Sequence, residues 1–203
     1  MRKTTQLLIL VILLSCSGEK SANQQIKKIS LEKKSIKEYF DVYKSNNDSF
    51  ALLMVERKLD SLFSLNIHDK ELYQIKGELL RQTNKYEEFA KLMEESTDYF
   101  PENPQSYFGA GLAYDKIGKH KKALQMYKMS IDSYDKIILK YPSLNNYINR
   151  AMSYSFYKSK ADGIIEFEKI KKSNLFDSTT VIAYQPMFYS FNKKKFIEDA
   201  FLN

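Results

Sequence analysis

The chain has 203 residues, 43% of them hydrophobic and 28% charged, with a formal net charge of +7, which is ordinary for one soluble globular domain. Only six glycines and four prolines accompany 15 tyrosines and 13 phenylalanines, and no stretch alternates long enough to build a multi-stranded sheet. Composition therefore favours an all-α fold with aromatic side chains between its helices, and the single cysteine excludes an internal disulfide.

The first 15 residues have the pattern of a signal peptide. A short basic start, Met1-Arg2-Lys3, precedes the unbroken apolar run "LLILVILL" at 7–14. Eight apolar residues are far fewer than the roughly 20 that a membrane-spanning helix needs. The run therefore predicts the hydrophobic core of a cleaved export signal.

The residues that follow, "LLSC" at 13–16, resemble the lipobox of bacterial lipoproteins. The resemblance implies cleavage before Cys16, acylation of its thiol and amine, and stable anchoring by more than one acyl chain. Ser17 follows Cys16 where retention at the inner membrane often uses aspartate, so the resemblance implies an outer-membrane location in the cell envelope. The alternative is an ordinary secretory signal with a cysteine at its boundary.

Residues 16–30 are expected to form a flexible tether behind lipidated Cys16, because "SGEKSANQQIKKIS" is polar and lacks an apolar period. The next segments, "SLEKKSIKEYFDVYKS" and "DSFALLMVERKLDSLFSL", predict a helical pair over 31–69.

A 34-residue period follows over residues 70–103 and from Pro104 onward. In the first unit, positions 4, 8, 11, 20 and 32 hold Tyr73, Gly77, Leu80, Phe89 and Pro101. In the second, positions 4, 8, 11, 15, 20 and 24 hold Tyr107, Gly111, Tyr114, Gly118, Ala123 and Tyr127. These units resemble the tetratricopeptide repeat, which implies helical hairpins stacked into a right-handed superhelix, an α-solenoid.

The same glycines do not form a phosphate-binding loop. Gly109-Ala110-Gly111 has Tyr114 in place of the third glycine, and no Gly-Lys-Ser/Thr ending follows. Positions 8 and 20 are instead where the two helices of a hairpin approach closely, so Phe89 predicts a splayed or repacked first hairpin. Asn84 and Gly118 are expected at helix C-termini, where left-handed backbone is needed.

Later repeats depart further from the pattern. The second unit extends to 143, and its six extra residues predict a second helix longer by nearly two turns before Pro142. A third, degenerate unit spans 144–177, with Gly163 at position 20. Residues 178–203 are expected to form capping helices, with Pro186 bending or breaking the first of them.

No residue pattern indicates catalysis. The only histidines, His68 and His120, form no zinc motif, with His68 placed on a turn and His120 at a position usually filled by a packing ring. Glu166 and Glu168 lie at helical-surface spacing beside lysines, as on a solvated face. We expect no enzyme activity, metal, cofactor, nucleic acid or small-molecule substrate.

The resemblance implies a recognition groove lined by the first helix of each repeat. Its positions select the partner-binding residues Arg81, Phe108, Leu112, Asp115, Lys116, Ile148, Met152 and Phe156. An apolar patch of this kind suits a peptide segment or helix of a partner protein. The alternative is that a neighbouring helix, such as the C-terminal cap, covers these side chains within the same molecule.

These features together predict a lipid-anchored scaffold or adaptor that binds another protein of the cell envelope. The second hypothesis is an inhibitor or immunity-type protein that sequesters one envelope enzyme or toxin. A secretion or assembly operon around the gene would favour the adaptor, and an adjacent hydrolase or toxin gene would favour the inhibitor.

Overall fold

The structure, a computed structural model, describes the backbone of residues 2–201 and the side chains of residues 24–201. Within residues 2–201 every regular element is a helix, so the fold is all-α as the composition predicts. The helices are α1 (Arg2–Asn46), α2 (Ser49–Ser64), α3 (Lys70–Gln82), α4 (Tyr86–Tyr99), α5 (Pro104–Lys116), α6 (His120–Lys140), α7 (Leu144–Tyr157), α8 (Lys160–Lys172), α9 (Ser178–Ile182), α10 (Gln185–Tyr189) and α11 (Lys193–Ala200).

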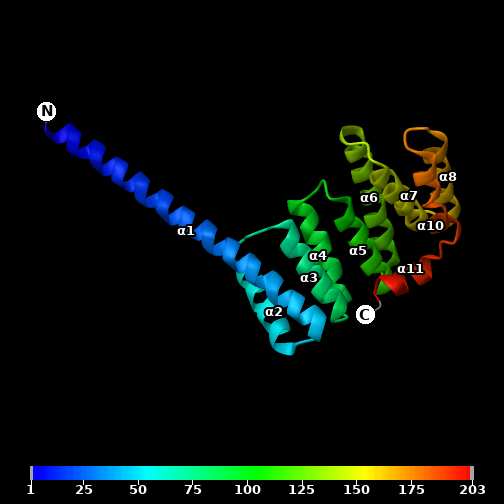
Figure 1. Cartoon of the computed structure of the whole chain (residues 1–203), viewed down its shortest axis with the longest axis horizontal. Coiled ribbons are helices and arrows are strands. Elements are labelled where there is room, and N and C mark those ends of the chain that lie inside the picture. Colours follow the sequence, from blue (N-terminus) through cyan, green and yellow to red (C-terminus); the bar gives the residue numbers. More distant parts are fainter. Residues whose placement is uncertain (1, 202–203) are drawn as a thin grey trace. The chain divides into compact units, whose positions relative to one another are not determined.

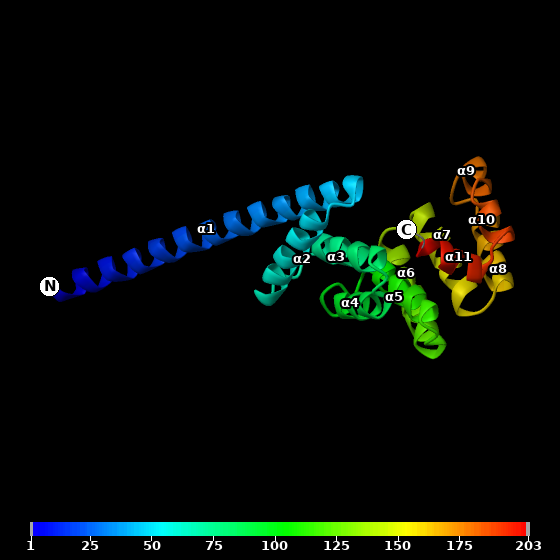
Figure 2. The same cartoon turned by 90° about the horizontal axis from the view of Figure 1, so that it is seen from below.

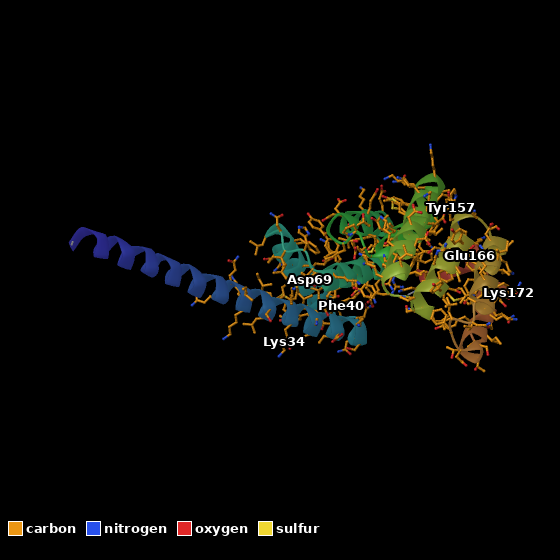
Figure 3. The ribbon with its side chains drawn as sticks, turned by 90° about the horizontal axis from the view of Figure 1, so that it is seen from above. Lys34, Phe40, Asp69, Tyr157, Glu166 and Lys172 are labelled. Carbon is orange, nitrogen blue, oxygen red and sulfur yellow. The ribbon has the colours of Figure 1, made fainter. Side chains whose placement is uncertain are left out.

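The chain divides into two compact units, residues 1–75 and 76–203. In the first unit α1 and α2 form an antiparallel pair joined by a short turn (Figure 1). Ile36 and Phe40 of α1 and Val55 and Leu59 of α2 are buried there. Phe40 lies on α1, and Asp69, which binds Lys33 at 2.6 Å, directly precedes α3 (Figure 3). Burial of one apolar face on each helix stabilises this pair.

Residues 24–30 differ from the expected flexible tether, because α1 runs through them without a break. From residue 19 to residue 46 the chain has no glycine or proline. No helix-breaking residue therefore separates residues 24–30 from the part of α1 that packs on α2. The rest of that segment, including Cys16, lies outside the residues whose side chains the structure describes.

In the second unit consecutive helices from α4 to α8 pack against one another, as in a solenoid (Figure 1). One apolar core runs through α4 to α11, and its largest fully buried rings are Tyr127, Phe156, Phe167 and Phe188. Phe167 of α8 stacks on Phe188 of α10 with ring centroids 4.8 Å apart, which holds the α9–α10 segment to α8.

Small residues bring α5 and α6 into close contact. A methyl group added to Gly111 would lie 2.5 Å from Cε1 of the buried Tyr127, so only glycine fits the present spacing. In the preceding hairpin Gly77 faces Phe89, with 3.0 Å between the position of an added methyl and Phe89 Cε2. The large ring at position 20 is thus accommodated by a glycine at position 8, which explains how the hairpin packs around Phe89.

The turns between helices use left-handed residues. Asn84 has a φ of 58° after α3 and Gly118 a φ of 76° after α5, as their turn positions predict. Side-chain caps begin several later helices: Ser143, Ser159 and Asn192 each accept a backbone N–H from the first turn of α7, α8 and α11. Helix α6, at 21 residues, carries the extra turns expected before Pro142.

Candidate functional site

The expected groove residues lie together in the second unit, but they do not form an open groove. Ile148, Met152 and Phe156 on α7 are 1–2% exposed, and Leu112 on α5 is 9% exposed. Phe108 is half-buried, with its ring centroid 5.1 Å from that of Phe156. The expectation of an exposed apolar patch is therefore wrong for these side chains. They are covered within the same molecule, which was the alternative interpretation.

The cover is residues 190–201, which we call the C-terminal segment. Helix α11 within it packs against α5 and lies beside the helices of the second unit (Figure 2). Phe191 and Phe196 place their ring centroids 5.1 Å from that of Phe156, in edge-to-face geometry. The ring centroid of Phe196 also lies 6.5 Å from that of Phe108. The C-terminal segment thus contributes aromatic rings where a partner peptide was expected.

A buried carboxylate fixes the segment by an ion pair. The Asp115 side chain is only 3% exposed, and its Oδ2 lies 2.8 Å from Nζ of Lys193. Lys193 also donates to the backbone oxygen of Phe156 at 3.2 Å and lies over the rings of Tyr127 and Phe156. A buried charge requires such partners, because leaving it unpaired in the core is costly.

Two further groups satisfy the Asp115 carboxylate. The Tyr127 hydroxyl donates to Oδ2 at 3.0 Å, and the His120 Nδ1 lies 2.8 Å from Oδ1. Burial, and then the charge and hydrogen bond of Asp115, raises the pKa of Tyr127 far above its ordinary value. Tyr127 therefore remains a neutral donor, and Asp115 is held by donors from both α6 and α11.

The far end of the segment is bound by the remaining groove residues. Arg81 donates from Nη1 to the backbone oxygen of Ala200 at 2.9 Å, across 119 positions of sequence. Phe201 packs edge-to-face on Tyr86, with centroids 5.0 Å apart, and Lys116 lies over both rings. Arg81 and Lys116 thus contact the C-terminal segment, as Phe108, Asp115 and Phe156 do. The other predicted groove residues, Leu112, Ile148 and Met152, belong to the same apolar core.

An open pocket of about 540 Å³ remains beside α11. It is lined by Asp115, Lys116, His120, Lys193, Lys194, Ile197 and Glu198. Cationic side chains predominate around the one buried carboxylate. The C-terminal segment therefore fills the apolar part of the groove and leaves its charged margin accessible to solvent.

The two histidines have hydrogen-bond partners. His68 lies 2.9 Å from the Tyr73 hydroxyl through Nδ1. His120 begins α6 with a side chain 75% exposed, so its expected packing position is wrong and its role is to contact Asp115. Among residues 24–201 no three His, Cys, Asp or Glu side chains gather as metal ligands.

Glu166 is not the solvated surface residue expected from its spacing. It lies on α8 (Figure 3), its side chain is 13% exposed, and it accepts hydrogen bonds from Arg150 and Lys169, each at 2.6 Å. Arg150 also binds Asp135, so one guanidinium links α6, α7 and α8. Burial raises the pKa of Glu166, but the hydrogen bonds and charges of Lys169 and Arg150 outweigh it and leave the pKa below its ordinary value.

The expected lipid attachment site, Cys16, and the signal peptide at 1–15 fall outside the side chains that the structure describes. No helix within the described part of the chain combines the length and apolar character that a bilayer crossing requires.

Comparison with known proteins adds no assignment: no protein-family model, curated protein or solved structure matches the chain.

Proposed function

We propose that the chain is a lipid-anchored, tetratricopeptide-like scaffold of the bacterial cell envelope, which binds a partner protein through the groove between α5 and α7. The observation that carries the proposal is the C-terminal segment itself. The groove holds a short helix through aromatic contacts to Phe156 and one ion pair to the buried Asp115. A surface that binds a helical segment of its own chain has the chemistry to bind one from a partner.

The proposed location at the outer membrane depends on the lipobox-like "LLSC" at 13–16 and on Ser17. The proposed right-handed superhelix depends on the repeat pattern of residues 70–177, which the packing of consecutive helices supports. We propose recognition without catalysis, on the basis of the residue patterns of the sequence.

The test is site-specific photo-crosslinking in intact envelopes. A photoreactive amino acid replaces Lys116, on the charged margin of the groove, or Lys128, whose exposed side chain lies on α6 and pairs with Asp132. We expect one discrete crosslinked protein from position 116 and none from position 128. Mass spectrometry identifies the captured protein, which must then bind the purified chain.

Crosslinking from position 128 alone, or from neither position, would contradict the groove as the binding surface. If the captured protein is a hydrolase or toxin whose activity the chain suppresses, the inhibitor hypothesis replaces the scaffold.

A further inference from the structure

The start of α11 in the C-terminal segment is fixed by a helix cap and by a contact between two aromatic rings. Asn192 caps α11 by accepting the backbone N–H of Lys195 at 3.0 Å. Phe191, immediately before the cap, and Phe196, in the fourth helical position, lie with ring centroids 6.2 Å apart, which is the arrangement of a hydrophobic staple. These contacts fix the entry of the helix and direct both rings and Lys193 to the same face.

The C-terminal segment is most deeply buried at its two ends, where Phe191 is 9% and Phe201 is 4% exposed. None of the side chains from Lys193 to Ala200 is fully buried, whereas Phe156 beneath them is 1% exposed. The charged pocket beside α11 gives solvent access to the Asp115–Lys193 ion pair. Removal of the segment would therefore uncover Phe156 and also expose the rings of Phe191 and Phe201, so a ligand that replaces the segment must supply rings of its own.

We propose that the groove accepts, in trans, a helical peptide carrying an aromatic residue, a lysine two positions later and a second aromatic residue three positions after that. This is the spacing of Phe191, Lys193 and Phe196, and the peptide exchanges with the C-terminal segment. The inference rests on the proposed function and names the chemistry of its ligand. The ligand must supply rings to Phe156 and a cation to Asp115, because an empty groove would expose both.

The negative charge of Asp115 should make the groove select a ligand with a lysine over one with a neutral or acidic residue at that position. Asp115 is 3% exposed in its side chain, so an acidic or neutral residue in place of the ligand lysine leaves the carboxylate without its cation. Lys195, two residues along α11, pairs instead with Asp199 and is 72% exposed. The two lysines therefore differ in their contact with the groove and provide a matched comparison.

The experiment uses the full chain in detergent and a fluorescent peptide, "SFNKKKFIEDAF", which reproduces residues 190–201. In the wild type the tethered segment competes at a millimolar effective concentration, so the peptide binds weakly. In the Lys193→Ala protein, where the tethered segment lacks its ion pair, we expect fluorescence anisotropy to show at least about tenfold tighter peptide binding. The Lys195→Ala protein is the control and should behave as the wild type.

Peptide variants test the chemistry directly. Against the Lys193→Ala protein, a peptide with alanine at the position of Lys193 should bind about tenfold more weakly, and alanine at the position of Lys195 should have little effect. Adding Asp115→Asn to the protein should remove the difference between these two peptides. A Phe196→Ala protein provides a second way of weakening the segment if the Lys193 variant melts early.

Equal peptide binding by wild type and both weakened variants, with helical content retained, would overturn the proposal. A stable dimer of the weakened variants that excludes the peptide would also overturn it, in favour of segment exchange between two copies. If crosslinking from position 116 succeeds while peptide exchange fails, the scaffold stands and its ligand chemistry is wrong. If exchange succeeds without crosslinking, the ligand chemistry stands and the envelope partner is wrong.

Discussion

Gly111 shows how one missing side chain sets the distance between two helices. The position of an added methyl lies 2.5 and 2.6 Å from two carbons of the Tyr127 ring, and that ring is fully buried and bonded to Asp115. Gly111→Ala should lower the free energy of unfolding by about 1–3 kcal/mol, because the ring is packed against Phe108 and Phe156 and can move only by displacing them. Urea denaturation monitored by circular dichroism measures the change.

Gly109, two residues earlier on α5, is the control. An added methyl there would lie 3.6 Å from Met93, an ordinary contact. Since alanine favours a helix over glycine by about 1 kcal/mol, Gly109→Ala should leave stability unchanged or raise it. Equal destabilisation by the two substitutions would show that the Tyr127 contact does not determine the effect.

Residue patterns with a local cause were predictable from the sequence. The left-handed turns at Asn84 and Gly118 follow from backbone sterics over a few residues. The close approach at Gly111 was expected from its position in the repeat pattern. The burial of Glu166 was not predictable from the sequence, because its spacing on α8 is that of a surface residue. Only the position of Arg150 on the neighbouring helix makes Glu166 a buried ion-pair partner, and sequence spacing within one helix carries no information on that.

At the scale of helices, the Arg150 network joins three of them. Glu166 on α8 and Asp135 on α6 both bind Arg150 on α7. The pKa of Glu166 is lowered from its ordinary value of 4.5, so its charge stabilises the fold above that pH. This contribution is lost as the pH falls through the lower pKa of the folded state, where the carboxylate becomes protonated.

Glu166→Gln should therefore lower the free energy of unfolding by about 1–2 kcal/mol at pH 7, and its difference from the wild type should shrink below pH 4.5. Denaturation at a series of pH values measures this. Glu102→Gln is the matched control, since Glu102 pairs with Lys140 but is 75% exposed, and its effect should stay below about 0.5 kcal/mol. A loss of stability independent of pH for Glu166→Gln would assign the effect to packing.

The positions of the helices are better predicted from the sequence than the packing of the helices against one another. The extra residues before Pro142 predict the long α6. The polar composition of residues 24–30 predicts a flexible tether, but they are helical, because no glycine or proline interrupts α1 there. The return of the C-terminal segment depends on contacts such as Arg81 to Ala200, 119 positions apart. The staple formed by Phe191 and Phe196 was a local sign of a helix there, but it does not specify which surface the helix covers.

At the scale of the whole molecule, the proposed anchoring depends on Cys16, the only cysteine in the chain. Cys16→Ala should abolish incorporation of labelled palmitate and move the protein from the membrane to the soluble fraction, because no other residue supplies a thiol for acylation. Metabolic labelling followed by fractionation of the envelope measures both effects.

Ser15→Leu tests the same motif without touching the thiol. A large residue before the cysteine does not fit the small-residue position of a lipobox, so the unprocessed precursor should accumulate. Ser17→Ala is the control and should leave cleavage and labelling intact. Continued palmitate labelling of Cys16→Ala would show that the "LLSC" resemblance is fortuitous. The protein would then have to bind its partner without a lipid anchor at Cys16.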